Sequence, residues 1–278
     1  MIYSMGYRDF TVGQGHKFII SNNIAKEEYD NHISILGEIK KLTSMRNIYN
    51  LMNRNGEDFL EYSSKIKEKL SLDNSDLMCF ESNRLLINYL SSMSMFIDYG
   101  EKYNGKYFGK SKVKEFQEKT HYLYDNHVSY RFMVRMRNYA LHYKFPLSEV
   151  RQHVSGPNGI FASRESLLQF KSWNCVEDDI KKMPDLILLD SHVKVSMMFI
   201  EHLYQGYIYD IAPIILESIE YINNMIRKSK GKEPILLKSK NVEEFKEGKF
   251  SIDIIDMKAY YEAFKIIESH PSIKINHR

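Results

Sequence analysis

The sequence has no long hydrophobic run, no large excess of one charge and few of the turn residues that short strands require. No apolar stretch approaches the roughly 18 residues of a membrane-spanning helix, so we expect no membrane partner. The 39 Lys and Arg residues nearly balance the 36 Asp and Glu residues, so only a local patch would attract a nucleic acid. Six prolines and 13 glycines among 278 residues are few for an all-β fold and favour an all-α protein.

Cysteines and metal-binding patterns are also scarce. Cys79 and Cys175 do not form a metal-type pair, and we expect both thiols to be reduced. No cluster of His, Asp or Glu has the spacing of metal ligands, so we expect no metal and no cofactor. The first residues lack the basic and then apolar pattern of a signal peptide, which predicts a cytoplasmic protein.

Two segments in the middle of the chain have apolar residues at helical spacing. The first begins at capping residues near Asn74 and ends near Gly105. The second begins at Ser111 and ends before Pro146, because proline restricts the residue that precedes it. Its apolar line consists of Phe116, Leu123, Tyr130, Val134 and Leu141. With a short glycine-containing turn between them, these segments predict a helical bundle built on a long antiparallel helix hairpin.

The flanking sequence predicts three parts. Residues 1–72 form an N-terminal helical extension, with a second short helix starting near Gly56, and residues 73–229 form the helical core. Residues 230–278 form a lysine-rich linker and a C-terminal helix. We expect only minor irregular or short β excursions, including extended pieces in the first 25 residues and a small hairpin between residues 146 and 175.

The second helix of the predicted hairpin carries an unusual set of polar residues. Arg131, Arg135, Asn138 and His142 follow one another at i, i+4, i+7 and i+11 and form a stripe that suits a polyanion. Arg137 interrupts the apolar line, where a guanidinium is costly unless it is paired. From these residues alone, a solvated basic face that ends in a histidine cap is the favoured interpretation.

The order Arg137-Asn138-Tyr139-Ala140-Leu141-His142 lies within the segment YRFMVRMRNYALHYKFPL, residues 130–147. This spacing resembles the Arg-x(4–6)-His signature of the HEPN family, the higher-eukaryote and prokaryote nucleotide-binding domains, in which a polar residue often follows the arginine. The upstream segment ESNRLLINYLSSMSMFID, residues 81–98, is similar to the helix that precedes this signature in bacterial HEPN-like proteins. The resemblance covers residues 77–147.

The resemblance implies a metal-independent endoribonuclease, acting as a homodimer on RNA and leaving a 2′,3′-cyclic phosphate. It implies that Arg137 binds the scissile phosphate and that His142 transfers the proton of the ribose 2′-hydroxyl. Asn138 would then orient the imidazole or the phosphate. Such nucleases resemble toxins and antiphage effectors, so we expect an antitoxin or another regulatory protein partner.

Four further residues are expected to bind RNA around these three. Arg131 and Arg135 would contact flanking phosphates. Arg84 and Asn88 share a helix face with Glu81 and would brace the site, although a surface salt bridge between Glu81 and Arg84 is an equally good interpretation.

Two other classes of protein are compatible with the same sequence. Many HEPN-like proteins resemble non-catalytic nucleotide-binding, RNA-binding or scaffold modules that keep the helical core. A purely structural helical protein is the third class, and it requires an acidic partner for Arg137 within the same chain.

Overall fold

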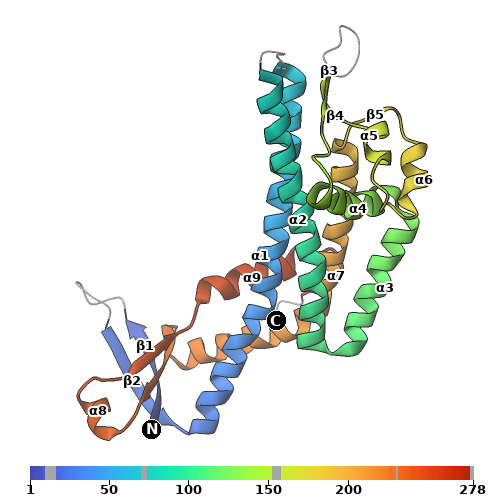
Figure 1. Ribbon diagram of the computed structural model, residues 1–278. Coiled ribbons are helices and arrows are strands. Elements are labelled where there is room, and N and C mark those ends of the chain that lie inside the picture. Colours follow the sequence, from blue (N-terminus) through green and yellow to red (C-terminus); the bar gives the residue numbers. More distant parts are fainter. Residues whose placement is uncertain (10–16, 70–73, 152–157, 230, 276–278) are drawn as a thin grey trace. The chain divides into compact units, whose positions relative to one another are not determined.

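The computed structural model describes residues 1–9, 17–69, 74–151, 158–229 and 231–275. Helices hold 69% of these residues, which confirms a mainly-α chain. The helices are α1 (Lys26–Lys69), α2 (Ser75–Phe108), α3 (Lys110–Asn126), α4 (Val128–His142), α5 (Arg164–Leu168), α6 (Val176–Lys181), α7 (Asp190–Lys228), α8 (Val242–Lys246) and α9 (Met257–Glu268) (Figure 1). The strands are β1 (Ile2–Asp9), β2 (Lys17–Ile24), β3 (Glu149–Arg151), β4 (Gly159–Ser163), β5 (Leu186–Ile187), β6 (Glu233–Ser239) and β7 (Ser251–Ile254).

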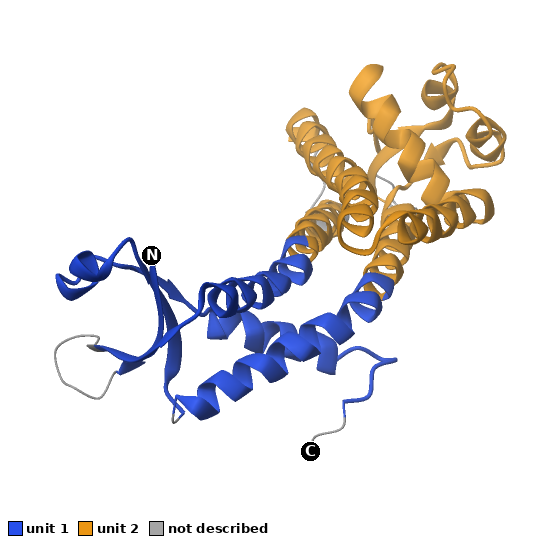
Figure 2. Ribbon diagram, turned by 90° about the horizontal axis from the view of Figure 1, so that it is seen from below, with its two compact units in different colours: residues 1–44, 206–278 blue, residues 45–205 orange. Residues whose placement is uncertain are grey.

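The chain forms two compact units whose bounds differ from the three expected parts, 1–72, 73–229 and 230–278. Unit 1 consists of residues 1–44 and 206–278, and unit 2 consists of residues 45–205 (Figure 2). The physical reason for the difference lies in strand pairing, because β1 at the start of the chain pairs with β6 near its end. Such a pairing joins segments that are distant in sequence and that no local pattern connects.

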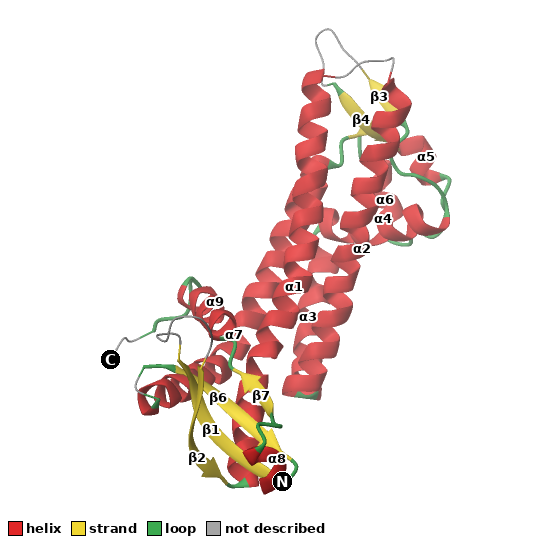
Figure 3. Cartoon of the chain, turned by 90° about the vertical axis from the view of Figure 1, so that its left-hand side faces the viewer, coloured by secondary structure: helices red, strands yellow, loops and turns green. Residues whose placement is uncertain are grey.

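Unit 1 contains a four-stranded antiparallel sheet, which is more extensive than the short β excursions expected within the mainly helical chain. The strand order is β2-β1-β6-β7 (Figure 3). The expected lysine-rich linker contains β6, a central strand in which Ile235, Leu236 and Leu237 are all buried. A strand with consecutive buried apolar residues is covered on both faces. The short apolar run Ile-Leu-Leu therefore forms a buried strand, although lysines surround it in the sequence.

The short helix expected from Gly56 onward is part of the 44-residue helix α1. A side chain at position 56 would overlap the thioether of Met197, which belongs to α7 and to the same unit. Gly56 is therefore a position of close helix packing rather than a helix boundary, although glycine in a helix interior costs about 1 kcal/mol relative to alanine.

The long antiparallel hairpin is not confirmed, because its second arm is two helices. His127 has an extended backbone, with φ −127° and ψ 108°, and separates α3 from α4. Its amide donates to the carbonyl of Leu123, and its own carbonyl accepts from the amide of Arg131. One extended residue thus ends one helix, starts the next and changes the direction of the chain.

The new direction of α4 buries more of the helix than the expected apolar line, of which Tyr130 is buried as predicted. Phe132, Met133, Met136 and Tyr139 are fully buried, whereas Leu141 of the expected apolar line is 44% exposed. Trp173 stacks on Tyr139 and on Phe132 of α4, with ring centroids 5.5 and 5.9 Å apart, and is itself fully buried. The expected small hairpin is present as the β3–β4 pair, while its turn at residues 152–157 lies outside the described residues.

Candidate functional site

The segment that follows α4 is held against α2 by one buried asparagine. The amide nitrogen of Asn83 donates to the carbonyl of Leu147 at 2.7 Å, and its side-chain oxygen accepts from the amide of Leu147 at 3.0 Å. The thiol of Cys79 donates to the same carbonyl at 2.9 Å, and burial raises its pKa. These bonds satisfy the backbone that follows Pro146 and position the last turn of α4.

Arg137 is the unusual residue of this helix. Its side chain is half-buried, and its Nε atom is buried without a hydrogen-bond partner. Within the described part of the chain, its guanidinium forms no hydrogen bond and no ion pair. The acidic partner that a purely structural role requires is therefore missing from these residues. A half-buried, unpaired guanidinium favours an anionic partner from outside the chain.

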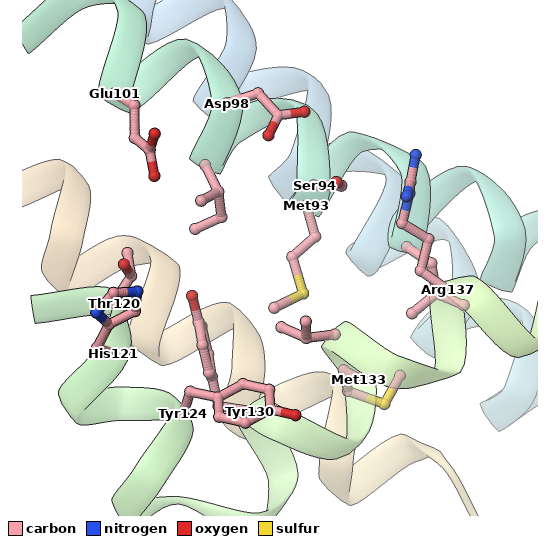
Figure 4. Close-up of a pocket in the computed structure, with 13 residues that line it drawn as sticks. Met93, Ser94, Asp98, Glu101, Thr120, His121, Tyr124, Tyr130, Met133 and Arg137 are labelled. Atoms are coloured by element: carbon pink, nitrogen blue, oxygen red, sulfur yellow. The ribbon is translucent and has the colours of Figure 1, made fainter. Parts of the chain in front are cut away.

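Arg137 lines a pocket of about 300 Å³ between α2, α3 and α4 (Figure 4). Figure 4 shows Asp98 and Glu101 on the α2 side and His121 on the α3 side, with Arg137 at the end away from His121. The base of the pocket is apolar and is formed by buried side chains, namely Leu90, Met93, Tyr130 and Met133. The lining therefore combines an apolar surface with two carboxylates and one guanidinium.

Asn138 and His142 do not line this pocket. Asn138 is half-buried, and His142 is exposed in the last turn of α4. Five residues of a regular helix turn through about 140° in projection, so Arg137 and His142 point to different sides of α4. Within one chain, the structure therefore does not bring the arginine and the histidine of the motif into one cleft.

Arg131 has internal partners for almost all of its hydrogen-bond donors. Nε donates to one carboxylate oxygen of Asp179 at 2.6 Å, and Nη2 donates to the other at 2.9 Å. Nη1 donates to the backbone carbonyls of Tyr124 and Asp125. The side chains of Arg131 and Asp179 are 16% and 14% exposed. Arg131 thus joins α3, α4 and α6, and this geometry leaves little of it for RNA.

Arg135 is also engaged within the unit. Its Nε donates to the phenol oxygen of Tyr124 at 2.8 Å, and its guanidinium lies 5.7 Å from the centre of that ring. Burial raises the pKa of Tyr124, and the hydrogen bond from Arg135 opposes this effect. Arg135 therefore anchors a residue of the pocket wall.

Arg84 and Asn88 are exposed on α2 and do not line the Arg137 pocket. The guanidinium of Arg84 pairs with Glu81, and its Nε donates to that carboxylate at 2.7 Å. The alternative of a surface salt bridge is thus the arrangement that the structure has. Asn88 uses its backbone carbonyl to accept from the hydroxyl of Ser92 at 2.9 Å.

Exposed hydrophobic side chains flank His142 in the sequence and also occur at the start of α2. We use the name apolar patch for five of them at the end of α4 and the start of α2: Leu77, Phe80, Leu141, Tyr143 and Phe145. The rings of Phe80 and Phe145 meet edge to face, with centroids 6.4 Å apart. A group of exposed aromatic and aliphatic side chains is typical of a surface that contacts another macromolecule.

Sequence reasoning missed the other polar residues of the pocket, Ser94, Asp98, Glu101, Thr120, His121 and Tyr124. A signal was present for Asp98 and Glu101, because Asp98 directly follows the apolar Ile97 in the first predicted helix and Glu101 lies one turn further along that helix. The α3 residues gave no such signal, because their approach to α2 depends on the packing of Phe116 against Gly100.

Among the described residues, no group of three or more His, Cys, Asp or Glu side chains is arranged to hold a metal ion. Of the helices in the described ranges, none contains a stretch both long and apolar enough to cross a membrane.

Comparison of the chain with protein-family models, with curated proteins and with solved structures finds no match.

Proposed function

We propose that this chain is a metal-independent endoribonuclease of the HEPN type that acts as a homodimer. The observation that carries the proposal is the unpaired guanidinium of Arg137, five residues before an exposed histidine at the end of the same helix. A phosphate group of RNA would supply the anion that Arg137 lacks within the described chain.

The homodimer follows from the directions of the two side chains. Because Arg137 and His142 point to different sides of α4, a second protomer is needed to complete a cleft that contains both residue types. The apolar patch beside His142 supports this arrangement, since its burial between two protomers would stabilise a dimer.

In the proposed reaction, the ribose 2′-oxygen attacks phosphorus and the bond to the 5′-oxygen breaks. His142 of one protomer accepts the proton of the 2′-hydroxyl, and His142 of the other donates a proton to the departing 5′-oxygen. Arg137 stabilises the charge that develops on the phosphate, and Asn138, one turn before His142, orients the imidazole or the phosphate. The products are a 2′,3′-cyclic phosphate and a 5′-hydroxyl.

Fewer residues are available to contact RNA around the three motif residues than the sequence suggested. Arg131 and Arg135 keep the site in place through Asp179 and Tyr124, whereas Arg84 and Asn88 are exposed and remain candidates for contacts with the strand. In the same proposal the enzyme is a toxin or antiphage effector in the cytoplasm, restrained by an antitoxin or regulatory protein.

The test compares wild type with His142→Ala on total RNA, in buffer that contains EDTA. Removal of a general acid or base typically lowers the rate about 10²–10⁴-fold, so the variant should be nearly inactive and should no longer arrest growth when expressed. His202→Ala, which removes an exposed histidine of α7, is the matched control and should cleave normally. Equal cleavage by wild type and His142→Ala would remove the catalytic assignment.

A non-catalytic ligand-binding module is the second candidate. The observation that favours it is the pocket, which is of a size that holds a small molecule and contains Arg137 without His142. This alternative predicts that wild type binds RNA or nucleotides and leaves RNA intact under all the conditions of the cleavage assay.

A further inference from the structure

We infer that the pocket between α2, α3 and α4 binds one nucleobase that carries an exocyclic amino group, next to a phosphate held by Arg137. The inference rests on the proposed function, which makes an RNA strand the source of the ligand. It adds which bases of that strand the pocket accepts. A free nucleotide has the same chemistry, and the experiment below separates the two sources.

The floor of the pocket has a surface that suits a flat ring. Leu90, Met93, Tyr130 and Met133 are at most 2% exposed, and together they present aliphatic, thioether and aromatic surface. A volume of about 300 Å³ is at the lower end for small-molecule pockets, which fits one base rather than an extended ligand. The polar groups on the walls then decide which base is accepted.

The α2 wall offers hydrogen-bond acceptors. Asp98 and Glu101 lie one turn apart on the same side of the helix, and an ionised carboxylate only accepts hydrogen bonds. Glu101 already accepts from the amide of Gln117 at 3.2 Å and has lone pairs to spare. The edge of the ligand that faces this wall must therefore donate hydrogen bonds to the two carboxylates. Adenine, cytosine and guanine present an amino group, whereas uracil presents carbonyl oxygens in its place.

The opposite end of the pocket requires an anion. Arg137 supplies the one permanent cation among the lining residues that the structure describes, and its Nε has no acceptor there. In Figure 4, Arg137 lies away from Glu101 and His121. A ligand with donors at one end and an anion at the other fits this distribution of charge, and a nucleotide unit has both.

The binding test uses the full chain as His142→Ala, because this residue does not line the pocket and RNA then stays intact. Titration calorimetry with GMP, AMP, CMP and UMP should give binding of the amino-bearing nucleotides about tenfold or more tighter than that of UMP. The double substitution Asp98→Asn and Glu101→Gln should abolish this preference. Glu118→Gln, which removes an exposed carboxylate of α3 paired with Lys114, should keep it. Circular dichroism melts check that each variant is folded.

Equal affinity for all four nucleotides, or a preference that the double substitution leaves unchanged, would overturn the inference. Short oligoribonucleotides that bind more tightly than the matching monophosphates identify an RNA strand as the source, and equal affinities identify the free nucleotide. Cleavage by wild type without preference for the neighbouring nucleobase would contradict the inferred nucleobase-binding pocket but not the proposed nuclease activity. A preference among the four nucleotides without any RNA cleavage would contradict the proposed nuclease activity and support the inferred nucleobase-binding pocket.

Discussion

At the scale of single residues, the three arginines of α4 differ in what surrounds them. Arg131 is bonded to Asp179 and to two backbone carbonyls, and Arg135 is bonded to Tyr124. Arg137 has no such partner among the described residues, although it is half-buried. A half-buried charge without a local partner is costly for stability, which supports the proposed role of Arg137 in binding an anion.

The difference in surroundings between Arg131 and Arg137 predicts that replacing each by methionine has a different effect on the free energy of unfolding. Arg131→Met should lower the free energy of unfolding by about 1–3 kcal/mol, because it leaves the Asp179 carboxylate without its partner in a mostly buried place. Arg137→Met should change the free energy of unfolding by less than about 0.5 kcal/mol or raise it, and should abolish RNA cleavage. Urea denaturation and a cleavage assay of both proteins measure the two effects. A large loss of stability in Arg137→Met would instead indicate a structural arginine.

His192 makes the stability of unit 2 depend on pH. Burial lowers the pKa of His192, whose Nδ1 atom is hydrogen-bonded to Ser129 at 3.0 Å. The unfolded chain then binds the proton more readily, so stability is complete above the ordinary pKa of 6.5 and falls as the pH drops below it. The melting temperature should therefore fall between about pH 7 and about pH 5.5.

His192→Gln should flatten this dependence, because glutamine does not titrate and can still bond Ser129. His202→Gln, at an exposed position of α7, should keep the slope of the wild type. The same slope in all three proteins would show that other groups cause it. Melting curves at several pH values provide the comparison.

At the scale of elements, the site depends on how closely α2, α3 and α4 pack. Gly100 of α2 lies directly against the ring of Phe116 of α3, so the two helices approach without an intervening side chain. His127 then redirects the chain into α4, and Asn83 holds Leu147, in the segment after α4, to α2. The pocket is the space that remains between these three contacts.

Two glycines in helix interiors should respond in opposite ways to alanine. Gly37 of α1 has no atom within 4 Å of the position of an added Cβ, so Gly37→Ala should raise the free energy of unfolding by about 0.5–1 kcal/mol. Gly100→Ala should lower it by about 1–3 kcal/mol, because the added methyl overlaps the buried ring of Phe116. Chemical denaturation followed by circular dichroism measures both. Stabilisation by Gly100→Ala would contradict the close packing of α2 and α3.

At the scale of the whole molecule, the proposed activity requires a second copy of the chain. The apolar patch, defined by Leu77, Phe80, Leu141, Tyr143 and Phe145, lies beside the exposed His142. Aromatic side chains in such a patch typically provide much of the binding energy of an interface.

Phe80→Asp should therefore convert the dimer to a monomer and remove RNA cleavage, since it places a charge in the buried centre of the interface. Tyr122→Asp, at a position of α3 that is 62% exposed and outside the patch, should leave both properties unchanged. Light scattering coupled to gel filtration gives the mass of each species. A wild-type monomer with full RNase activity at the same concentration would exclude the dimeric site.

Local sequence patterns determined which segments of this protein are helical and where several helices begin or end. The predicted C-terminal helix corresponds to α9 at Met257–Glu268, and α2 begins next to Asn74, although the side chain of Asn74 forms no capping hydrogen bond. The arginine and histidine of the motif were also placed correctly on one helix. These features depend on spacing and capping within a few residues, which a sequence displays directly.

Only the tertiary structure decided the sheet, the break at His127 and the surroundings of each arginine. The pairing of β1 with β6 and the ion pair of Arg131 with Asp179 join residues that are far apart in sequence. The side of α4 that is buried depends on Trp173, and the pocket depends on residues of three helices. Periodicity shows that a helix has an apolar side, but the partner that covers this side is a property of the folded chain, because burial is a contact between distant segments.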